Sequence, residues 1–526
     1  MSLTGWLLFF LIIQVIHFAG TWKLYQKAGR QGWQAAIPVY NAFILMRIIN
    51  RPWWWTILLF VPVVNLIMFP VLWVETIRSF GFVSRKDTVL VILTLGLYIF
   101  YFNYTNQGQY KGNRSLQARS KLGETVSSIL FAVVAATIVH TYVMQPFTIP
   151  TPSLEKSLLV GDFLFVSKFH YGARLPQTTV SFPMVHDTIP LVKTKSYLQK
   201  PQLPYYRLPG FESVERNDIV VFNWPTDTVR MFRDKSGKHY DKPIDKKSNY
   251  VKRCVGIAGD SLMIENGIVY VNDVPLQLPE RADVQRAYLV KGKEGEPFNP
   301  RWLKERYKIS SQIYWENESE NLYRFMGISD ESLKKFKNHP KVASIERYYR
   351  PKSFKNLKIF PNNGKVDWNI DQFGPVYIPE KGATIKLTAD NFSIYKRVIE
   401  VYEGSEMGLQ NKLSLKDDQV YLNDEAIDDY TFKQNYYWMM GDNRYNSEDS
   451  RFWGFVPHTH IVGKPVFIWL SIDGSKSGLF DKIRTSRVFT TVSGEGERVS
   501  YFPYFAIALV IFIGYRYYRK RKKSDG

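Results

Sequence analysis

Cysteine and histidine are scarce in this chain, which has one cysteine and eight histidines among 526 residues. The single thiol, Cys254, cannot close an intramolecular disulfide bond. The histidines are scattered and form no HExxH pattern and no zinc-type cluster with cysteine, so a protein-bound catalytic metal is not expected. We therefore expect chemistry that uses side chains alone, with no metal and no other cofactor.

Composition argues against two further classes, a disordered chain and a small disulfide-rich scaffold. Hydrophobic residues make up 45% of the chain and aromatic residues 16%. Such a sequence has enough apolar side chains for a large core.

Acidic residues are too few to balance the basic ones, and the formal net charge is +21. Residues 1–144 contain 12 basic and 3 acidic side chains, and residues 501–526 contain 6 and 1. The 356 residues between these segments have a net charge of only +7. The excess charge therefore flanks apolar segments, as in proteins that span membranes, and does not indicate a nucleic-acid partner.

Five apolar stretches are predicted to cross a membrane, since four of them within 145 residues leave too little polar chain to cover them in water. They are residues 3–19, 53–73, 88–102, 126–143 and 502–515. Several are shorter than the roughly 20 residues that a helix needs to cross a bilayer, so their helices must extend into flanking aromatic residues. A re-entrant second segment is the alternative to a complete second span.

The positions of lysine and arginine predict how the chain is oriented in the membrane, because short loops rich in these residues stay in the cytoplasm. With five spans, the basic segment 21–52, the loop before the fourth span and the C-terminal tail fall on one side. That loop contains Lys111, Arg114, Arg119 and Lys121. We expect a multi-pass protein of the plasma (inner) membrane, in contact with lipid, whose N-terminus and large region 145–500 lie outside the cytoplasm.

The region after the fourth span is predicted to be mainly β. Short β-branched or aromatic runs between turn-forming residues predict strands at 163–166, 218–223, 250–255, 267–272, 384–388 and 462–470. Residues 281–355 are more charged, and helices are predicted there near 301–307 and 331–338. We therefore expect an α-containing insertion within a β domain.

These patterns divide the chain into six predicted parts. They are a polytopic membrane region (1–125), a transmembrane helix (126–144), the first part of the β domain (145–280), the insertion (281–355), the second part of the β domain (356–500), and a C-terminal transmembrane helix with a basic cytoplasmic tail (501–526).

The first motif with chemical potential, Ile149-Pro-Thr-Pro-Ser153-Leu-Glu-Lys156, begins a few residues after the fourth span. Its two prolines restrict the backbone and would hold Ser153 rigidly near the membrane surface. That location suits a substrate that is itself tethered to the membrane. For the serine alone, a plain turn before a strand is the alternative.

The second motif is Tyr250-Val-Lys252-Arg-Cys254-Val-Gly256. Strand alternation would turn Lys252 to the same face as Tyr250 and Cys254. Burial there would lower the pKa of the lysine, which could then accept a proton from a serine near neutral pH. A lysine that reaches out from a surface strand is the alternative.

The third motif occupies residues 440–457 and reads Met-Gly-Asp-Asn-Arg-Tyr-Asn-Ser-Glu-Asp-Ser-Arg-Phe-Trp-Gly-Phe-Val-Pro. Its Asp, Asn, Ser and Arg side chains are too polar for a core, and they could brace a neighbouring site through hydrogen bonds and ion pairs. A turn network without a catalytic role is the alternative.

Together with Arg216-Asn-Asp218-Ile-Val-Val-Phe222, these motifs resemble in their order the conserved boxes of type I signal (leader) peptidases. Those enzymes are membrane-bound serine endopeptidases with a Ser/Lys dyad, and they remove signal peptides from exported preproteins. The segment 23–55 is similar to the extra membrane domain of the long forms of the family. The resemblance implies a membrane-anchored enzyme with a mainly β catalytic domain outside the cytoplasm.

The resemblance also implies roles at the reaction centre. Ser153 would be the nucleophile and Lys252 the general base. The Thr151 hydroxyl would help to form the oxyanion hole with the backbone N–H of Ser153. Ile149 and Val251 would line shallow pockets for small substrate residues at the first and third positions before the cut.

The third motif would then supply the supporting residues. Ser447 would orient the lysine, Asp449 and Arg451 would form an ion pair, and Asp442 and Arg444 would belong to the same brace.

The chain departs from the family pattern at several positions. Tyr445 stands where the family often has aspartate, and Ser153-Leu-Glu-Lys-Ser157 replaces the usual Ser-Met-x-Pro-Thr. Ser153 and Lys252 are 99 residues apart, a long spacing that an insertion at 170–215 would explain.

Two other functions fit parts of the sequence. Ser153-Leu-Glu-Lys156, Ser319-Glu-Asn321 and Lys476-Ser-Gly478 follow the order of motifs in penicillin-binding acyltransferases. That chemistry needs the serine and the lysine one turn apart on a helix, for which the neighbouring prolines leave little room. The other alternative is a membrane-anchored binding module without activity.

Overall fold

The structure is a computed structural model that describes residues 3–105, 107–118, 120–229, 234, 236–293, 298–364, 366–478 and 480–524. Arg119 and residues 525–526, which the predicted orientation and C-terminal tail include, lie outside the described residues. The chain folds into two compact units, and each is described by itself.

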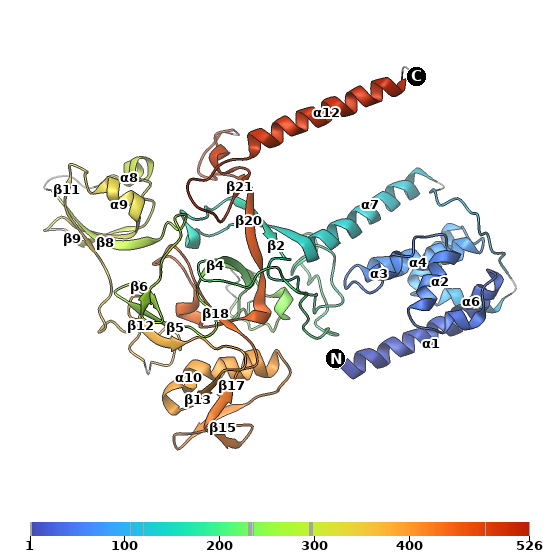
Figure 1. The fold of residues 1–526 in the computed structure, drawn as a ribbon, viewed down its shortest axis with the longest axis horizontal. Coiled ribbons are helices and arrows are strands. Elements are labelled where there is room, and N and C mark those ends of the chain that lie inside the picture. The colour runs from blue at the N-terminus through green and yellow to red at the C-terminus, as the bar shows by residue number, and fades with distance from the viewer. Residues whose placement is uncertain are drawn as a thin grey trace. The chain divides into compact units, whose positions relative to one another are not determined.

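The first unit contains Met1–Val143, Arg174–Leu208 and Val229–Lys246. Its N-terminal part is helical (Figure 1), and its helices bury a common apolar core that includes Leu24, Met46 and Phe102. The helices are α1 (Leu3–Lys27), α2 (Tyr40–Ile48), α3 (Trp55–Leu58), α4 (Asn65–Ser79), α5 (Arg85–Leu93), α6 (Tyr98–Tyr104) and α7 (Lys121–Ile138).

Two helices among the described residues are long and apolar enough to cross a membrane, Leu3–Lys27 and Lys121–Val143. They coincide with the first and fourth predicted spans. The pair Arg85–Leu93 and Tyr98–Tyr104, at the third predicted span, could together form one more, although the two helices are bent by 114°. The structure therefore supports two or three spans, whereas the sequence analysis predicted five.

Local backbone breaks explain the difference in the second and third segments. Residues 53–73 do not form one helix, because Pro62 follows the short α3 and Val63 has a left-handed φ of 69° before α4 begins. In the third segment Gly96 adopts a positive φ of 85° between α5 and α6. Each break interrupts the helical hydrogen bonds before a span is complete.

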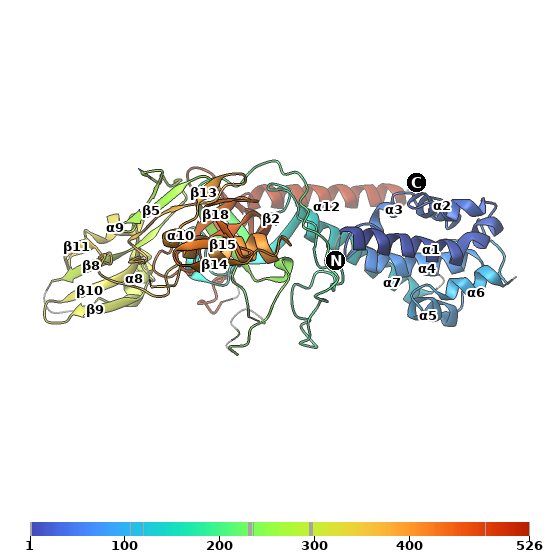
Figure 2. The same ribbon diagram turned by 90° about the horizontal axis from the view of Figure 1, so that it is seen from below.

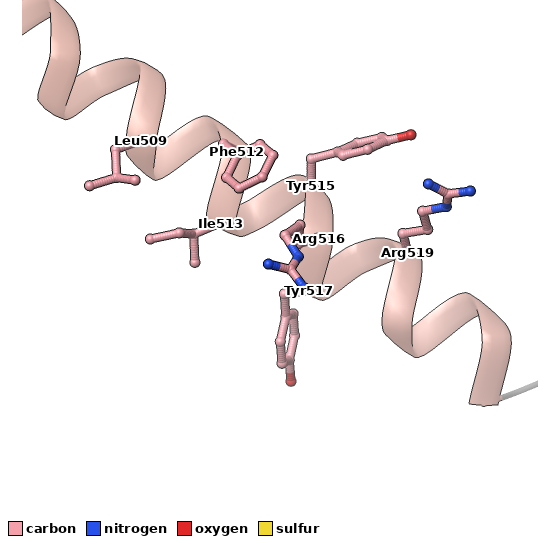
Figure 3. A pocket seen from close by; sticks show the side chains of 7 residues that line it. All are labelled: Leu509, Phe512, Ile513, Tyr515, Arg516, Tyr517 and Arg519. Atoms are coloured by element: carbon pink, nitrogen blue, oxygen red, sulfur yellow. The ribbon is translucent and has the colours of Figure 1, made fainter. Parts of the chain in front are cut away.

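The fifth predicted span is a helix, α12 (Phe502–Ser524), in the second unit. Figure 3 shows that its apolar side chains Leu509, Phe512 and Ile513 give way within two turns to tyrosines and arginines. The early change to polar residues leaves an apolar stretch shorter than a bilayer needs. The seven residues that line the pocket at this place all belong to this one helix, and among the described residues no polar group from another element lines it.

The second unit contains Met144–Ala173, Pro209–Thr228 and Lys247–Gly526, and it is mainly β. Its central sheet has the order β1-β2-β20-β3-β4-β18-β19, and β21 pairs with β20. The strands are β1 (Met144–Thr148), β2 (Asp162–Ser167), β3 (Ile219–Asn223), β4 (Asn249–Gly256), β18 (Tyr436–Met440), β19 (Val456–Pro457), β20 (Ile461–Ser471) and β21 (Thr490–Thr491). Strands β3 and β18 are buried along their whole length, which explains their continuous apolar sequences.

Smaller sheets surround this one. One has the order β12-β5-β6-β7, a second β14-β15-β16, and a third is the pair β13-β17. Their strands are β5 (Ser261–Glu265), β6 (Ile268–Val271), β7 (Val274–Pro275), β12 (Phe373–Tyr377), β13 (Thr384–Lys386), β14 (Leu413–Lys416), β15 (Gln419–Leu422), β16 (Glu425–Ile427) and β17 (Asp429–Thr431). The remaining helices outside the insertion are α10 (Ala389–Arg397) and α11 (Ser450–Trp453).

The predicted insertion contains the expected helices, α8 (Pro300–Tyr307) and α9 (Asp330–Phe336), and also a four-stranded sheet of order β11-β8-β10-β9. Its strands are β8 (Gln285–Gly292), β9 (Ile313–Asn317), β10 (Leu322–Ser329) and β11 (Val342–Arg347). Phe325 and Phe336 are buried in a separate core between sheet and helices. The insertion is therefore an α/β element with its own core.

Candidate active site

Ser153 lies in a short 3₁₀ helix, Pro152–Leu154, just after strand β1. Backbone hydrogen bonds close the loop that carries it, because the Ile149 N–H donates to the Asp162 carbonyl at 2.9 Å and the Gly161 N–H donates to the Ile149 carbonyl at 3.0 Å. The Ser153 side chain is buried. The sequence thus fixes the serine in a closed, proline-containing loop at the edge of the central sheet.

Lys252 lies on β4, between β3 and β18, and its backbone pairs with Val220. Its Nζ is 2.7 Å from Ser153 Oγ, within hydrogen-bond distance. The side chain is buried, and burial lowers the pKa of the lysine to about 8, although the nearby Asp449 and Glu448 carboxylates oppose this shift. The amine can therefore exist in its neutral form near neutral pH.

Thr151 precedes the 3₁₀ helix and is half-buried. Its backbone is extended, with φ −134°, and its hydroxyl does not cap the helix. The threonine is thus two residues from Ser153 on the same loop.

Asp442 follows β18 and forms a fully buried ion pair with Arg253, at 2.6 and 2.8 Å. The Ser157 hydroxyl donates to the same carboxylate at 2.5 Å. Although burial alone would raise the pKa of Asp442, Arg253 and Ser157 hold it below its usual range. This ion pair connects strand β4, the serine loop and the end of β18.

The backbone after Asp442 also binds the serine loop. The Asn443 N–H donates to the Ser153 carbonyl at 3.0 Å, and the Asn443 side chain donates to the Pro152 carbonyl at 3.2 Å. The carbonyl side of Ser153 is therefore fixed by the third motif.

Asp449 and Arg451 form a second buried ion pair, with contacts of 2.8 and 2.9 Å. Burial would raise the pKa of Asp449, but Arg451 and the backbone N–H of Gly441 keep it below its usual range. Arg451 also donates to the Arg444 carbonyl at 2.6 Å. The two ion pairs are thus linked through the chain between residues 441 and 451.

Arg444 lies within the brace, and Ser447 lies against Gly441. The Asp442 carboxylate binds Arg253 and not Arg444, which joins the brace through its backbone carbonyl. Within the described part of the chain, no hydrogen bond joins the Ser447 hydroxyl to Lys252. The Ser447 side chain packs against Gly441, where an added Cβ would overlap it and would lie 2.5 Å from the Ser153 carbonyl oxygen.

Ile149 and Val251 belong to one hydrophobic cluster with Leu154 and Val221. Ile149 is buried and Val251 is partly buried. The structure therefore brings both predicted pocket residues together beside the serine loop.

Two arginines beyond β20 also bind the serine loop. Arg487 donates to the Asp162 carboxylate, with Nε at 3.1 Å, and to the Ser157 carbonyl at 3.3 Å. Arg498 donates to that same carbonyl at 2.7 Å. The Arg281 guanidinium organises the segment before Arg498 by donating to Thr491 Oγ1 and to the carbonyls of Ser493 and Glu495, each within 3.0 Å.

Lys156, the lysine of the alternative motif, does not share a helix with Ser153. The 3₁₀ helix ends at Leu154, and Lys156 has a left-handed φ of 76°. Its amine donates to the backbone carbonyl of Lys308 in the insertion. The helical arrangement that acyltransferase chemistry needs is absent at this loop.

Sequence reasoning missed Arg253, Ser157, Gly441 and Arg498. Arg253 and Gly441 stand within quoted motifs, and their proximity to assigned residues was the available signal. No signal in the sequence pointed to Arg498, because its contact with Ser157 joins residues that are 341 positions apart in the chain.

Comparison with known families assigns most of the second, mainly β unit to one family. Residues 122–332 and 380–470 match the family described as signal peptidase, peptidase S26. Residues 33–113 match a separate family of unknown function, DUF5684.

Individual relatives agree with the family match. The chain is 26% identical over 365 residues to signal peptidase I of Buchnera aphidicola subsp. Acyrthosiphon pisum, covering 69% of this chain and 80% of the relative. It is 23% identical over 381 residues to signal peptidase I of Haemophilus influenzae, covering 71% and 76%. A shorter match, 29% identical over 171 residues, joins it to signal peptidase I of Rickettsia felis, covering 32% and 49%. Because the family match extends over more than half of the chain, this protein belongs to the signal peptidase S26 family of serine peptidases.

Proposed function

We propose that this signal peptidase cleaves exported preproteins with a dyad of Ser153 and Lys252. The observation that carries the proposal is the 2.7 Å contact between the serine hydroxyl and a buried lysine whose pKa is lowered to about 8. A neutral amine at that distance can take the hydroxyl proton directly. Family membership supports signal peptide removal, and the geometry supports the assignment of the two residues.

In the proposed reaction, Ser153 Oγ attacks the scissile carbonyl while Lys252 Nζ accepts its proton. The tetrahedral intermediate collapses when the ammonium returns that proton to the leaving amine, and the signal peptide remains as an ester on Ser153. A water molecule, deprotonated by the same amine, then attacks the ester carbonyl; the bond to Ser153 Oγ breaks and the ammonium returns the proton to Oγ, which releases the signal peptide. The Thr151 hydroxyl and the Ser153 N–H would stabilise the oxyanion in both steps.

The supporting residues would keep this geometry fixed. The ion pairs Asp442–Arg253 and Asp449–Arg451 are fully desolvated, so their loss would leave a buried charge and loosen the loop. Ile149 and Val251 would line the shallow pockets that restrict the substrate to small side chains before the cut. The Ser447 side chain, which packs against Gly441, would help to orient Lys252.

The membrane orientation is also a proposal. α1 ends at Lys27 and α7 begins at Lys121, so their basic ends fit one cytoplasmic side. The N-terminus and the region 145–500 would then lie outside the cytoplasm of a multi-pass inner-membrane protein. The bent segment α5–α6 would enter and leave the membrane on the same side, and α12 would be the last membrane segment. The six parts predicted from the sequence would then be the domains of the protein.

The direct test is cleavage of a preprotein with Ala-x-Ala before its cut by the detergent-purified full chain. Ser153→Ala should abolish cleavage, and the matched control Lys156→Ala should retain it. If Lys156→Ala were inactive while Lys252→Ala cleaved normally, or if penicillin labelled the protein covalently, the acyltransferase alternative would replace the proposal. Full activity of Ser153→Ala would contradict the serine mechanism.

A further inference from the structure

A long ribbon in the first unit ends in an apolar, exposed tip. Antiparallel bridges pair Arg174 with Arg207 and Thr188 with Lys195, so the chain turns back near residues 189–194. The Ile189 N–H donates to the Thr194 carbonyl at 2.9 Å across this turn. The turn therefore has a defined conformation.

The side chains at this turn are unusually exposed for apolar residues. Leu191 is 96% exposed and Val192 is 65% exposed. Phe182, Met184 and Leu198, farther down the ribbon, are also exposed. Apolar side chains that gather on an exposed surface mark a site of contact with a partner or a membrane.

The charge of the ribbon identifies the kind of partner. Residues 174–208 contain five basic residues and one acidic residue. Lys193 and Lys195 are exposed near the tip and Lys200 is exposed farther down the ribbon, whereas Asp187 pairs with Lys242 at 3.4 Å. Apolar side chains next to lysines match the surface of a bilayer that contains anionic lipid, whose headgroups attract cations and whose acyl region accepts the apolar side chains.

The ribbon is attached to a helix that can span a membrane. Trp6 Nε1, near the start of α1, donates to the Gln202 carbonyl at 2.9 Å. Tryptophan side chains concentrate at the interface between membrane and water, so this contact links the ribbon to that level of the bilayer. In Figures 1 and 2 the ribbon runs close to the N-terminal end of α1.

We propose that the tip at residues 189–192 inserts into the bilayer surface at the N-terminal end of α1, with Lys193, Lys195 and Lys200 against anionic lipid headgroups. The inference rests on the proposed span α1. It gives the chain a membrane contact besides its helices, and nothing in the dyad chemistry requires it.

A single fluorescent probe can test the insertion in the full chain. Leu191→Cys is labelled with an environment-sensitive dye and reconstituted into phosphatidylcholine vesicles with and without phosphatidylglycerol. Native Cys254 is fully buried and burial raises the pKa of its thiol, so it should not react. Unlabelled wild type checks this, and Glu425→Cys, at the exposed start of strand β16 in the second unit, is the reference for a probe in water.

We expect brominated lipid to quench the probe at position 191 and aqueous iodide to leave it bright, with the reverse at position 425. Lys193→Gln with Lys195→Gln should remove the additional quenching that phosphatidylglycerol produces. Quenching of probe 191 by iodide, and not by lipid, would overturn the inference. Shielding that appears only after a preprotein is added would also overturn it, in favour of substrate docking.

Val192→Cys repeats the measurement if Leu191→Cys does not fold. Because the fluorescence needs no catalysis, its outcome is independent of whether the dyad assignment is correct.

Discussion

At the scale of single residues, the sequence predicted which side chains meet but not how they are held. Ser153 and Lys252 could be identified from their motifs, and the structure brings their reactive atoms to 2.7 Å. The partner of Asp442 could not be identified, because ion pairs between residues 189 positions apart depend on the sheet and not on local sequence. Cys254, expected on the face of the lysine, is a fully buried core residue whose thiol donates to the Gly256 carbonyl.

Thr151 provides the first residue-scale prediction. If its hydroxyl donates to the oxyanion, Thr151→Val should lower kcat roughly 100-fold with little change in KM, because the hydrogen bond exists only in the transition state. Thr151→Ser should retain most of the activity. Steady-state kinetics on a preprotein peptide measure both, and a rise in KM alone would indicate a packing role instead.

Gly441 provides the second. A methyl group at this position would collide with the Ser447 side chain and the Ser153 carbonyl, so the nucleophile should be displaced. We expect Gly441→Ala to lower kcat by about 10- to 100-fold, as misplaced reacting groups do. Gly474→Ala is the matched control, since no atom lies within 4 Å of its added methyl group. Equal activity of the two variants would refute this role.

At the scale of elements, strands were predicted better than membrane helices. The predicted strands at 218–223, 250–255 and 462–470 correspond to β3, β4 and β20 with ends that differ by one residue at most. Their runs of β-branched and aromatic residues predict both that these segments are strands and that the strands are buried. The second predicted span does not form one helix, because the backbone breaks at Pro62 and Val63, and the apolar composition of residues 53–73 does not reveal this break. Thr388, predicted at the end of a strand, instead caps helix α10.

The segment between β20 and α12 provides an element-scale prediction. Arg498 holds the Ser157 carbonyl and therefore positions the serine loop without touching substrate. Arg498→Gln should lower kcat by about tenfold and leave KM and the pH profile unchanged, and Arg498→Lys should recover part of the loss. The control is Arg301→Gln, at an exposed position on α8. A change confined to thermal stability would argue against positioning.

At the scale of the whole molecule, the family and its chemistry were predictable, whereas the arrangement of the additional segments was not. The order of four short motifs sufficed for the family, and the family match covers the parts of the β unit that contain them. The insertion was predicted from its charge, yet its sheet was not, because charged residues such as Arg286, Glu316 and Arg324 interrupt the apolar residues of its strands. The N-terminal region matches a family of unknown function, so the family match does not predict its role.

The central claim is that Lys252 acts as a neutral base, and the pH dependence of kcat/KM tests it most directly. Because the lysine must lose its proton to act, the rate should rise with pH, about tenfold per unit below pH 8, and level off above the lysine pKa of about 8. Lys252→Ala should retain less than about a hundredth of the activity and lose this acid limb. An acid limb near the ordinary lysine value, or one that persists unchanged in Lys252→Ala, would contradict the account.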